Sequence, residues 1–329
     1  MKRPASAVDD ESTPPKKRMK KTKGYCLTAE KWNVDAGASK DEKEEALQQY
    51  KKMAEASIQE KQELLMEARL FIQRQIRDTE PSQSVEDLSS FWEGGPPIMS
   101  DWFEWLVGGS KLGCMAQAAS EQMVKVLNIV EDFIISKRGD EFEGEMKHVK
   151  DTAVELNGNT TMFQVFLLKD LAKLFKNKPQ KIIFVDGKDD KHNGPEDKDP
   201  NIFITKQNIY GEDEFEEKIF IHLRIGDKVV WKDVSLPEAL AGVIQVYFSF
   251  NILYPPDSDD FLQFVERIIC NFGSDDGARN KKNMVKKEFR DFQVSFPSII
   301  GLILFNDLQG FAARLLLESN QGQIMNVFV

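Results

Sequence analysis

Histidine, cysteine and carboxylate side chains are the groups that could carry acid–base, nucleophilic or metal chemistry, and their spacing in this chain builds no such site. His148, His192 and His222 have no second histidine, cysteine or paired carboxylate at metal-ligand spacing. His222 lies in an alternating run and faces away from Ile221 and Leu223, which is typical of a surface histidine on a strand. We therefore expect no metal, no cofactor and no catalytic residue here.

The polar segment 186–200 superficially resembles a calcium-binding loop, because it holds five Asp and one Glu. If Asp189 takes the first position of an EF-hand, Lys191 falls at the third and Pro200 at the twelfth. A cation among the ligands and the lack of a closing Glu argue against that loop. The segment is predicted to be a solvated loop.

The cysteines and glycines also favour a protein without catalysis. Cys26, Cys114 and Cys270 show no motif spacing, and the last two fall within apolar helical patterns, as small buried residues do. So few cysteines fit a reducing compartment. The glycine pairs lack the Lys-Ser/Thr of a phosphate-binding loop. An enzyme stays open as a third interpretation, because a pocket cannot be seen in a sequence.

Basic residues near the N-terminus form two clusters separated by twelve residues, which is the pattern of a bipartite nuclear localisation signal. Residues 1–23 hold eight Lys/Arg and three Asp/Glu, a net charge of +5, whereas the whole chain carries −10. Residues 24–329 therefore carry −15, and such a charge repels nucleic acid. We predict a nuclear location, with an import receptor as a partner. The two clusters consist of Lys2, Arg3, Lys16, Lys17, Arg18, Lys20 and Lys21.

Two apolar features are candidate interaction surfaces. Residues 41–78 show apolar side chains at a period near 3.6, which predicts a long amphipathic helix. We expect its first half to project into solvent and its second half to pack on the body or on a partner; a self-associating coiled coil is an alternative. A Trp-rich block follows, for which core packing is the simpler interpretation and a partner-binding patch the other. The candidate surface consists of Leu65, Ile72, Ile76, Trp92, Trp102 and Trp105.

These features belong to four predicted parts of the chain. Residues 1–40 are expected to be disordered, 41–80 to form the long amphipathic helix, and 84–273 to form the body; 274–329 is a charged linker followed by an apolar tail. The tail either docks on the body, binds a partner or has no evolved role. No apolar window reaches the ~18 residues of a membrane-spanning helix, so we expect no membrane partner.

The predicted body is of the α+β class, mainly helical with a small, mostly antiparallel sheet. Helical patterns come first, short strand patterns follow, and Gly226-Asp227 indicates a β-hairpin turn. Two helices then close the body. The predicted helices are 85–92, 98–107, 116–135, 161–176, 236–251 and 258–272, and the predicted strands are 181–185, 201–205, 218–225 and 229–231.

The order of blocks in the body resembles a family of animal proteins. A Trp-containing block at 91–103 precedes a long helix, short strands and a hairpin at 225–231, and the nearest likeness lies at 236–255 and 261–266. These features are similar to the C-terminal region of the sterile-alpha-motif-containing vertebrate proteins and of their fish and invertebrate relatives. No sterile alpha motif precedes the body here, and the acidic loop and the tail depart from the pattern. The resemblance implies a lineage-expanded module and brings no established activity.

The sequence as a whole favours a nuclear protein-interaction or scaffold module without evident catalysis, whose partners would be other nuclear proteins. The alternative is a nucleic-acid-associated nuclear protein that binds through its basic segments, 16–23 and 281–287.

Overall fold

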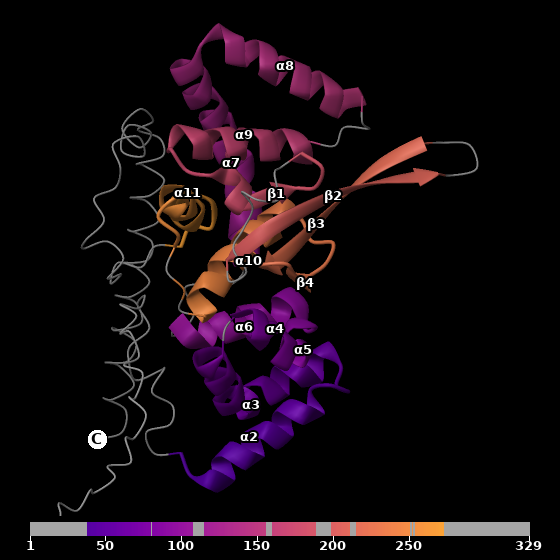
Figure 1. Cartoon of the computed structure of the whole chain (residues 1–329), viewed down its shortest axis with the longest axis vertical. Helices are drawn as coiled ribbons and strands as arrows, with labels where there is room; N and C mark the ends of the chain where they lie inside the picture. Colours follow the sequence, from indigo (N-terminus) through magenta and orange to yellow (C-terminus); the bar gives the residue numbers. More distant parts are fainter. Residues whose placement is uncertain are drawn as a thin grey trace, which may run out of the picture.

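Helices make up most of the protein, and one four-stranded sheet lies among them (Figure 1). The structure, a computed structural model, describes residues 38–79, 81–107, 115–155, 160–188, 199–210, 215–250, 252 and 254–272. The localisation signal, nearly all of the expected disordered segment and the tail 274–329 lie outside these residues. Within them, the α+β class with a small, mostly antiparallel sheet is confirmed.

The segment 41–78 forms two helices, α2 (Lys40–Lys52) and α3 (Ile58–Asp78), where a single long helix was expected. Ser57 interrupts the helix because its side chain accepts a hydrogen bond from the backbone N–H of Glu60, while the Glu60 carboxylate accepts one from the N–H of Ser57 (2.8 Å). This reciprocal capping box starts a new helix. The apolar period of the segment continues across the break and therefore conceals it.

The first half of this segment does not project into solvent, which corrects the expectation. Tyr50 is buried, with its ring 4.8 Å from that of Phe71, and its hydroxyl donates to the carbonyl of Asp87 (3.3 Å). Lys61, the polar interruption of the apolar face, is buried as well, and its ammonium donates to the carbonyl of Ser90 (3.2 Å). The two helices thus belong to the same core as the rest of the protein.

The Trp-rich block forms three short helices that link α3 to the centre of the protein. The Trp92 ring stacks on Phe250 with centroids 5.4 Å apart, and Trp102 meets Phe91 edge-on at 5.7 Å. Offset and edge-on contacts of this kind are the favourable aromatic geometries. The three helices are α4 (Pro81–Asp87), α5 (Ser89–Trp92) and α6 (Gly95–Val107).

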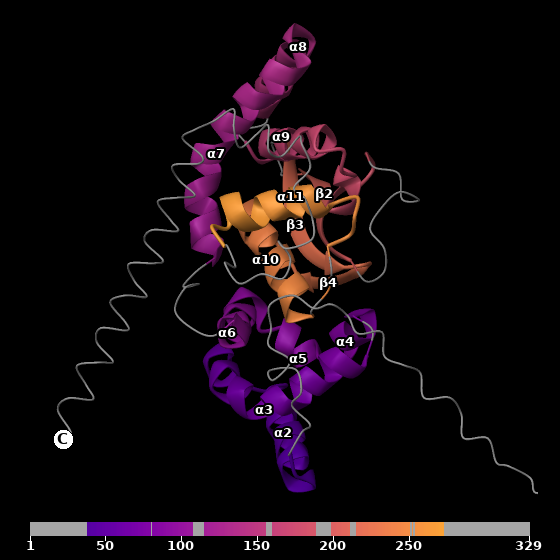
Figure 2. The ribbon, with the colours of Figure 1, turned by 90° about the vertical axis from the view of Figure 1, so that its left-hand side faces the viewer.

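Three further helices form the opposite end of the molecule, α7 (Met115–Arg138), α8 (Asp140–Glu155) and α9 (Thr161–Leu174) (Figures 1 and 2). Helix α8 was not predicted. Gly139 ends α7 at a φ of 72°, and acidic residues in the first turn of α8 complement the positive end of its dipole. Phe142 anchors α8 by stacking on Phe166 of α9 at 5.5 Å.

The four strands follow one another in the sheet in chain order, β1-β2-β3-β4. Strand β1 pairs with β2 in parallel, and the other neighbours are antiparallel. Strands β2 and β3 are much longer than their neighbours. The last part of β2 and the first part of β3 therefore pair only with each other, and they form a two-stranded arm that projects from the body (Figure 1). The strands are β1 (Ile183–Val185), β2 (Pro200–Tyr210), β3 (Phe215–Ile225) and β4 (Lys228–Trp231).

Helix α10 (Leu236–Ser249) covers one face of this sheet, which we call the inner face. Ile202, Ile204 and Leu223 point into this contact and are fully buried. Gly242 allows the close approach, since a Cβ there would lie 2.2 Å from the Trp231 ring. A short turn, η1 (Pro179–Lys181), lies between α9 and β1, and α10 is followed by α11 (Asp259–Phe264) and a π-helical turn, η3 (Val265–Ile269).

Replacing Gly242 by Ala should destabilise the protein by about 1–3 kcal/mol, because the added methyl group overlaps Trp231 and Leu223. Gly144→Ala in α8 is the matched control: a Cβ at Gly144 meets nothing within 4 Å, so helix propensity alone should stabilise the protein by about 0.5–1 kcal/mol. Urea unfolding of both variants measures the two effects. A Gly242→Ala variant as stable as wild type would contradict the close packing of α10 on the sheet.

Candidate functional site

Five of the six residues expected on an interaction surface lie in the core. Leu65, Ile72 and Trp102 are fully buried, and Ile76 and Trp92 are nearly so. Trp105 is partly exposed, with its ring 5.2 Å from that of Trp102. The aromatic density and the apolar period of these segments reflect core packing, so none of the five can contact a partner while the fold is intact.

His148, His222 and Cys270 lie on three separate parts of the structure. His148 is exposed on α8, whereas His192, Cys26 and Cys114 lie outside the described residues. Cys270 is buried, and burial raises the pKa of its thiol far above the ordinary value, with Glu266 adding to the effect. This thiol stays protonated and unreactive. Within the described ranges, no cluster of histidine, cysteine, aspartate or glutamate could hold a metal ion.

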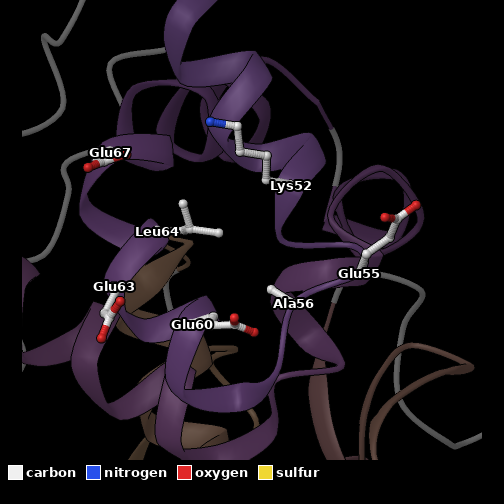
Figure 3. Close-up of a pocket in the computed structure, with 7 residues that line it drawn as sticks. All are labelled: Lys52, Glu55, Ala56, Glu60, Glu63, Leu64 and Glu67. Atoms are coloured by element: carbon white, nitrogen blue, oxygen red, sulfur yellow. The ribbon is translucent and has the colours of Figure 1, made fainter.

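A hollow of about 420 Å³ lies at the junction of α2 and α3 (Figure 3). Four of the side chains around it are glutamates, and Glu60 among them already caps α3. A group of mutually repelling carboxylates does not form a binding site by itself. The hollow is lined by Lys52, Glu55, Ala56, Glu60, Glu63, Leu64 and Glu67.

The outer face of the sheet, opposite α10, offers a more specific arrangement. The register places Phe203 beside His222 and beside Phe184, and Thr205 beside Phe220. Side chains directly opposite each other on neighbouring strands share a face, so all of these residues lie on the outer face. The Phe203 ring lies 6.0 Å from that of Phe184 and 6.2 Å from that of His222. An aromatic row therefore crosses three strands.

Arg224 stands at one end of this row, two residues from His222 on β3. Its guanidinium carbon lies 3.8 Å from the ring centroid of Phe203 and 5.7 Å from that of Phe184, in cation–π geometry. Its Nε donates to Oδ1 of Asn201 (3.1 Å). Burial lowers the pKa of Arg224, whereas the more distant carboxylates of Asp227 and Asp186 raise it. The side chain stays charged, since arginine is not deprotonated in proteins.

Asn201 holds the Arg224 side chain in position through a hydrogen bond. It is fully buried, and its amide donates to the carbonyls of Asp199 (3.1 Å) and Gly226 (3.0 Å). With both amide donors occupied by backbone, the remaining oxygen faces Arg224. The hairpin turn, Asn201 and the arginine thus form one hydrogen-bonded unit, which holds the guanidinium in a defined position.

His222 is held as a neutral imidazole. Its Nδ1 accepts a hydrogen bond from the backbone N–H of Asp233 (3.2 Å), so the ring proton is on Nε2. Partial burial lowers the pKa of His222, and the charges of Arg224 and Lys232 lower it further, while Asp233 raises it. Together Arg224, His222 and the aromatic row can recognise a ligand through planar contacts and hydrogen-bond donors. Among these residues there is no nucleophile–base pair of the kind used in covalent catalysis.

Comparisons with known proteins do not indicate a role for this site. No family model, no curated protein and no solved structure matches the chain. The resemblance to the sterile-alpha-motif-containing proteins therefore stays a prediction. None of the described helices has the length and apolar character needed to cross a membrane.

The sequence contained part of the signal for this site. The alternation along β3 placed His222 away from the core, and the same alternation places Phe220 and Arg224 on that face. The partners of Arg224 could not be found in this way, because Asn201 and Phe203 belong to another strand. The register between β2 and β3 is what brings them together.

The pKa of His222 should lie below its ordinary value of 6.5, and Arg224→Gln should raise it by removing a nearby positive charge. As the pH falls below 6.5, His222 is protonated in the unfolded chain before it is protonated in the folded protein. The free energy of unfolding should therefore decrease as the pH falls from 6.5 to the pKa of His222 in the folded protein. NMR titration of the imidazole measures both values, and urea unfolding against pH, compared with His222→Gln, measures the stability effect. An unchanged pKa in the Arg224→Gln variant would contradict their proximity.

Proposed function

We propose that the protein is a nuclear interaction or scaffold module that binds an acidic segment of a partner protein on the outer face of its sheet. The observation that carries this proposal is the aromatic row, which is buried at Phe184 and partly exposed on β2 and β3. Phe203 and Phe220 are only half-buried, and Val229, which pairs with Arg224 across the sheet, is 39% exposed. Helix α10 covers the other face of the sheet.

The arm supports a polypeptide partner in particular. Beyond Ile204 on β2 and Ile221 on β3, the two strands pair with each other and with no further described strand. Strand edges of this kind accept an added extended chain, which gains backbone hydrogen bonds there. An extended segment could therefore lie along the arm and reach the aromatic row.

The charge of this face supports an acidic partner segment. Arg224 and Lys218 are cations on the outer face and attract a carboxylate locally, although the body as a whole carries a strong negative charge. Nucleic acid is less favoured, because its repeated phosphates would also meet Asp186, Asp227 and Asp233 beside the row. A peptide with one or two carboxylates avoids that repulsion.

The proposed nuclear location rests on the two basic clusters. A tagged full-length protein should accumulate in the nucleus, and a variant with Lys16, Lys17, Arg18, Lys20 and Lys21 changed to Ala should become cytoplasmic, because the import receptor loses its charged ligand. Fluorescence microscopy of both proteins measures the partition. Equal distribution of the two proteins would refute the nuclear part of the proposal.

Val229→Glu tests the binding face. A glutamate at 229 would lie directly across from Arg224 and occupy its guanidinium, so it should reduce proximity labelling of the bound proteins about tenfold, which corresponds to about 1.4 kcal/mol. Val124→Glu is the matched control, since Val124 is 71% exposed on α7 and lies on a different element. Thermal unfolding should show both variants folded.

The two labelling profiles decide this part of the proposal. Loss of the same proteins in both variants, or in neither, would place the interface elsewhere. Loss in Val229→Glu alone is the expected result.

A further inference from the structure

Arg224 is a charged residue that is held in place by Asn201 and Phe203 and forms no ion pair with the residues that the structure describes. It is half-buried, yet no carboxylate of the described residues lies within ion-pair distance of it. Asp227 and Asp186 act on it only through longer-range attraction. Removing part of a charge's hydration without pairing it costs free energy, and this cost offsets part of the stabilisation from the Asn201 hydrogen bond and the Phe203 contact.

The environment of Arg224 determines which of its donors are occupied. Nε is engaged by Asn201, and Phe203 covers a face of the guanidinium plane. The four N–H donors of the two terminal amino groups make no hydrogen bond to the described residues. This planar pair of amino groups matches the two oxygens of a carboxylate, and the stacked ring reduces the entropy lost when they bind.

The neighbourhood favours a single small anion over a polyanion. His222 lies near Arg224 as a neutral donor through Nε2, and Val229 and Phe220 offer apolar contacts on the same face. The nearby acidic groups, Asp186, Asp227 and Asp233, would repel a chain of phosphates but leave room for one carboxylate.

We infer that Arg224 is the specificity residue of the outer face, and that it binds the side-chain carboxylate of an Asp or Glu in an extended peptide segment of the partner. This inference rests on the proposed function and adds to it the chemistry of recognition. Asn201 is a positioning residue, because it acts on the ligand only by orienting Arg224. Phe203 supports the guanidinium from one side, and the apolar row receives the side chains next to the acidic one.

The test begins with the selection of a peptide probe that binds the protein. Random twelve-residue peptides displayed on phage are selected on the full-length wild-type protein, and the tightest binder is synthesised. We expect an Asp or Glu at one fixed position among apolar neighbours. The synthetic peptide, its Asp→Asn or Glu→Gln counterpart and a single-stranded dT12 oligonucleotide are then titrated by fluorescence anisotropy.

Three protein variants are compared with the wild type in these titrations. Arg224→Gln should weaken the acidic peptide at least tenfold and leave its amide counterpart unchanged, because the lost contact is the one to the carboxylate. Arg224→Lys should weaken it to a smaller extent, since the charge remains but the planar fork is lost. Lys147→Gln, at an exposed site on α8, removes the same charge and should bind as wild type does.

The outcomes separate the inference from the proposed function. Selected peptides that bind the wild-type protein and Arg224→Gln equally would overturn the role of Arg224 and leave the peptide-binding face standing. Failure to enrich any peptide, with dT12 bound instead, would overturn both and favour nucleic acid. Equal thermal unfolding of Arg224→Gln and wild type is required first; if that variant unfolds early, Arg224→Lys and the two peptides provide the same comparison.

Discussion

The burial of α10 on all sides is the constraint on which the rest of the structure depends. Its residues from Ala239 to Ser249 are all buried, and a helix that is apolar around its whole circumference needs cover in every direction. Helices α6 and α7, the π-helical turn and the inner face of the sheet supply that cover. Gly242 permits the sheet to come close, and Phe250 at the end of the helix receives Trp92 from the Trp-rich block.

This arrangement leaves the sheet with two unlike faces. Helix α10 covers the inner face, so Ile202, Ile204 and Leu223 are fully buried in the core. The outer face carries the aromatic row and Arg224, and Phe203 and Phe220 remain partly exposed there. The asymmetry of the sheet thus follows from the needs of one helix, and the candidate site follows from the asymmetry.

The sequence predicted local patterns well and junctions poorly. Alternation placed β3 and the orientation of His222, and the hairpin turn at Gly226 was found from its dipeptide. The boundary between α2 and α3 was missed although Ser57 and Glu60 show the spacing of a capping box, because the apolar period dominated the interpretation. Helix α8 was missed although Phe142, Met146 and Val149 fall at helical spacing, because charged residues dominate the segment.

The candidate site was beyond sequence reasoning for a different reason. Whether Leu65 or Trp102 faces a partner or the core depends on how far the rest of the chain can cover it, and no local pattern contains that information. The meeting of Arg224 with Asn201 and Phe203 likewise depends on a register between strands. Residues that carry a strong local signal proved to be core, whereas the candidate site is built from residues that are unremarkable until the sheet is assembled.

The choice of arginine at 224 connects stability to recognition. A lysine there would keep the charge but could neither stack flat on Phe203 nor donate through Nε to Asn201, so its ammonium would move with the side chain. A leucine would pack on the aromatic row without the cost of a half-buried charge. The arginine gives up some stability for a fixed set of donors, and this is the balance that the proposed recognition of an acidic segment would require.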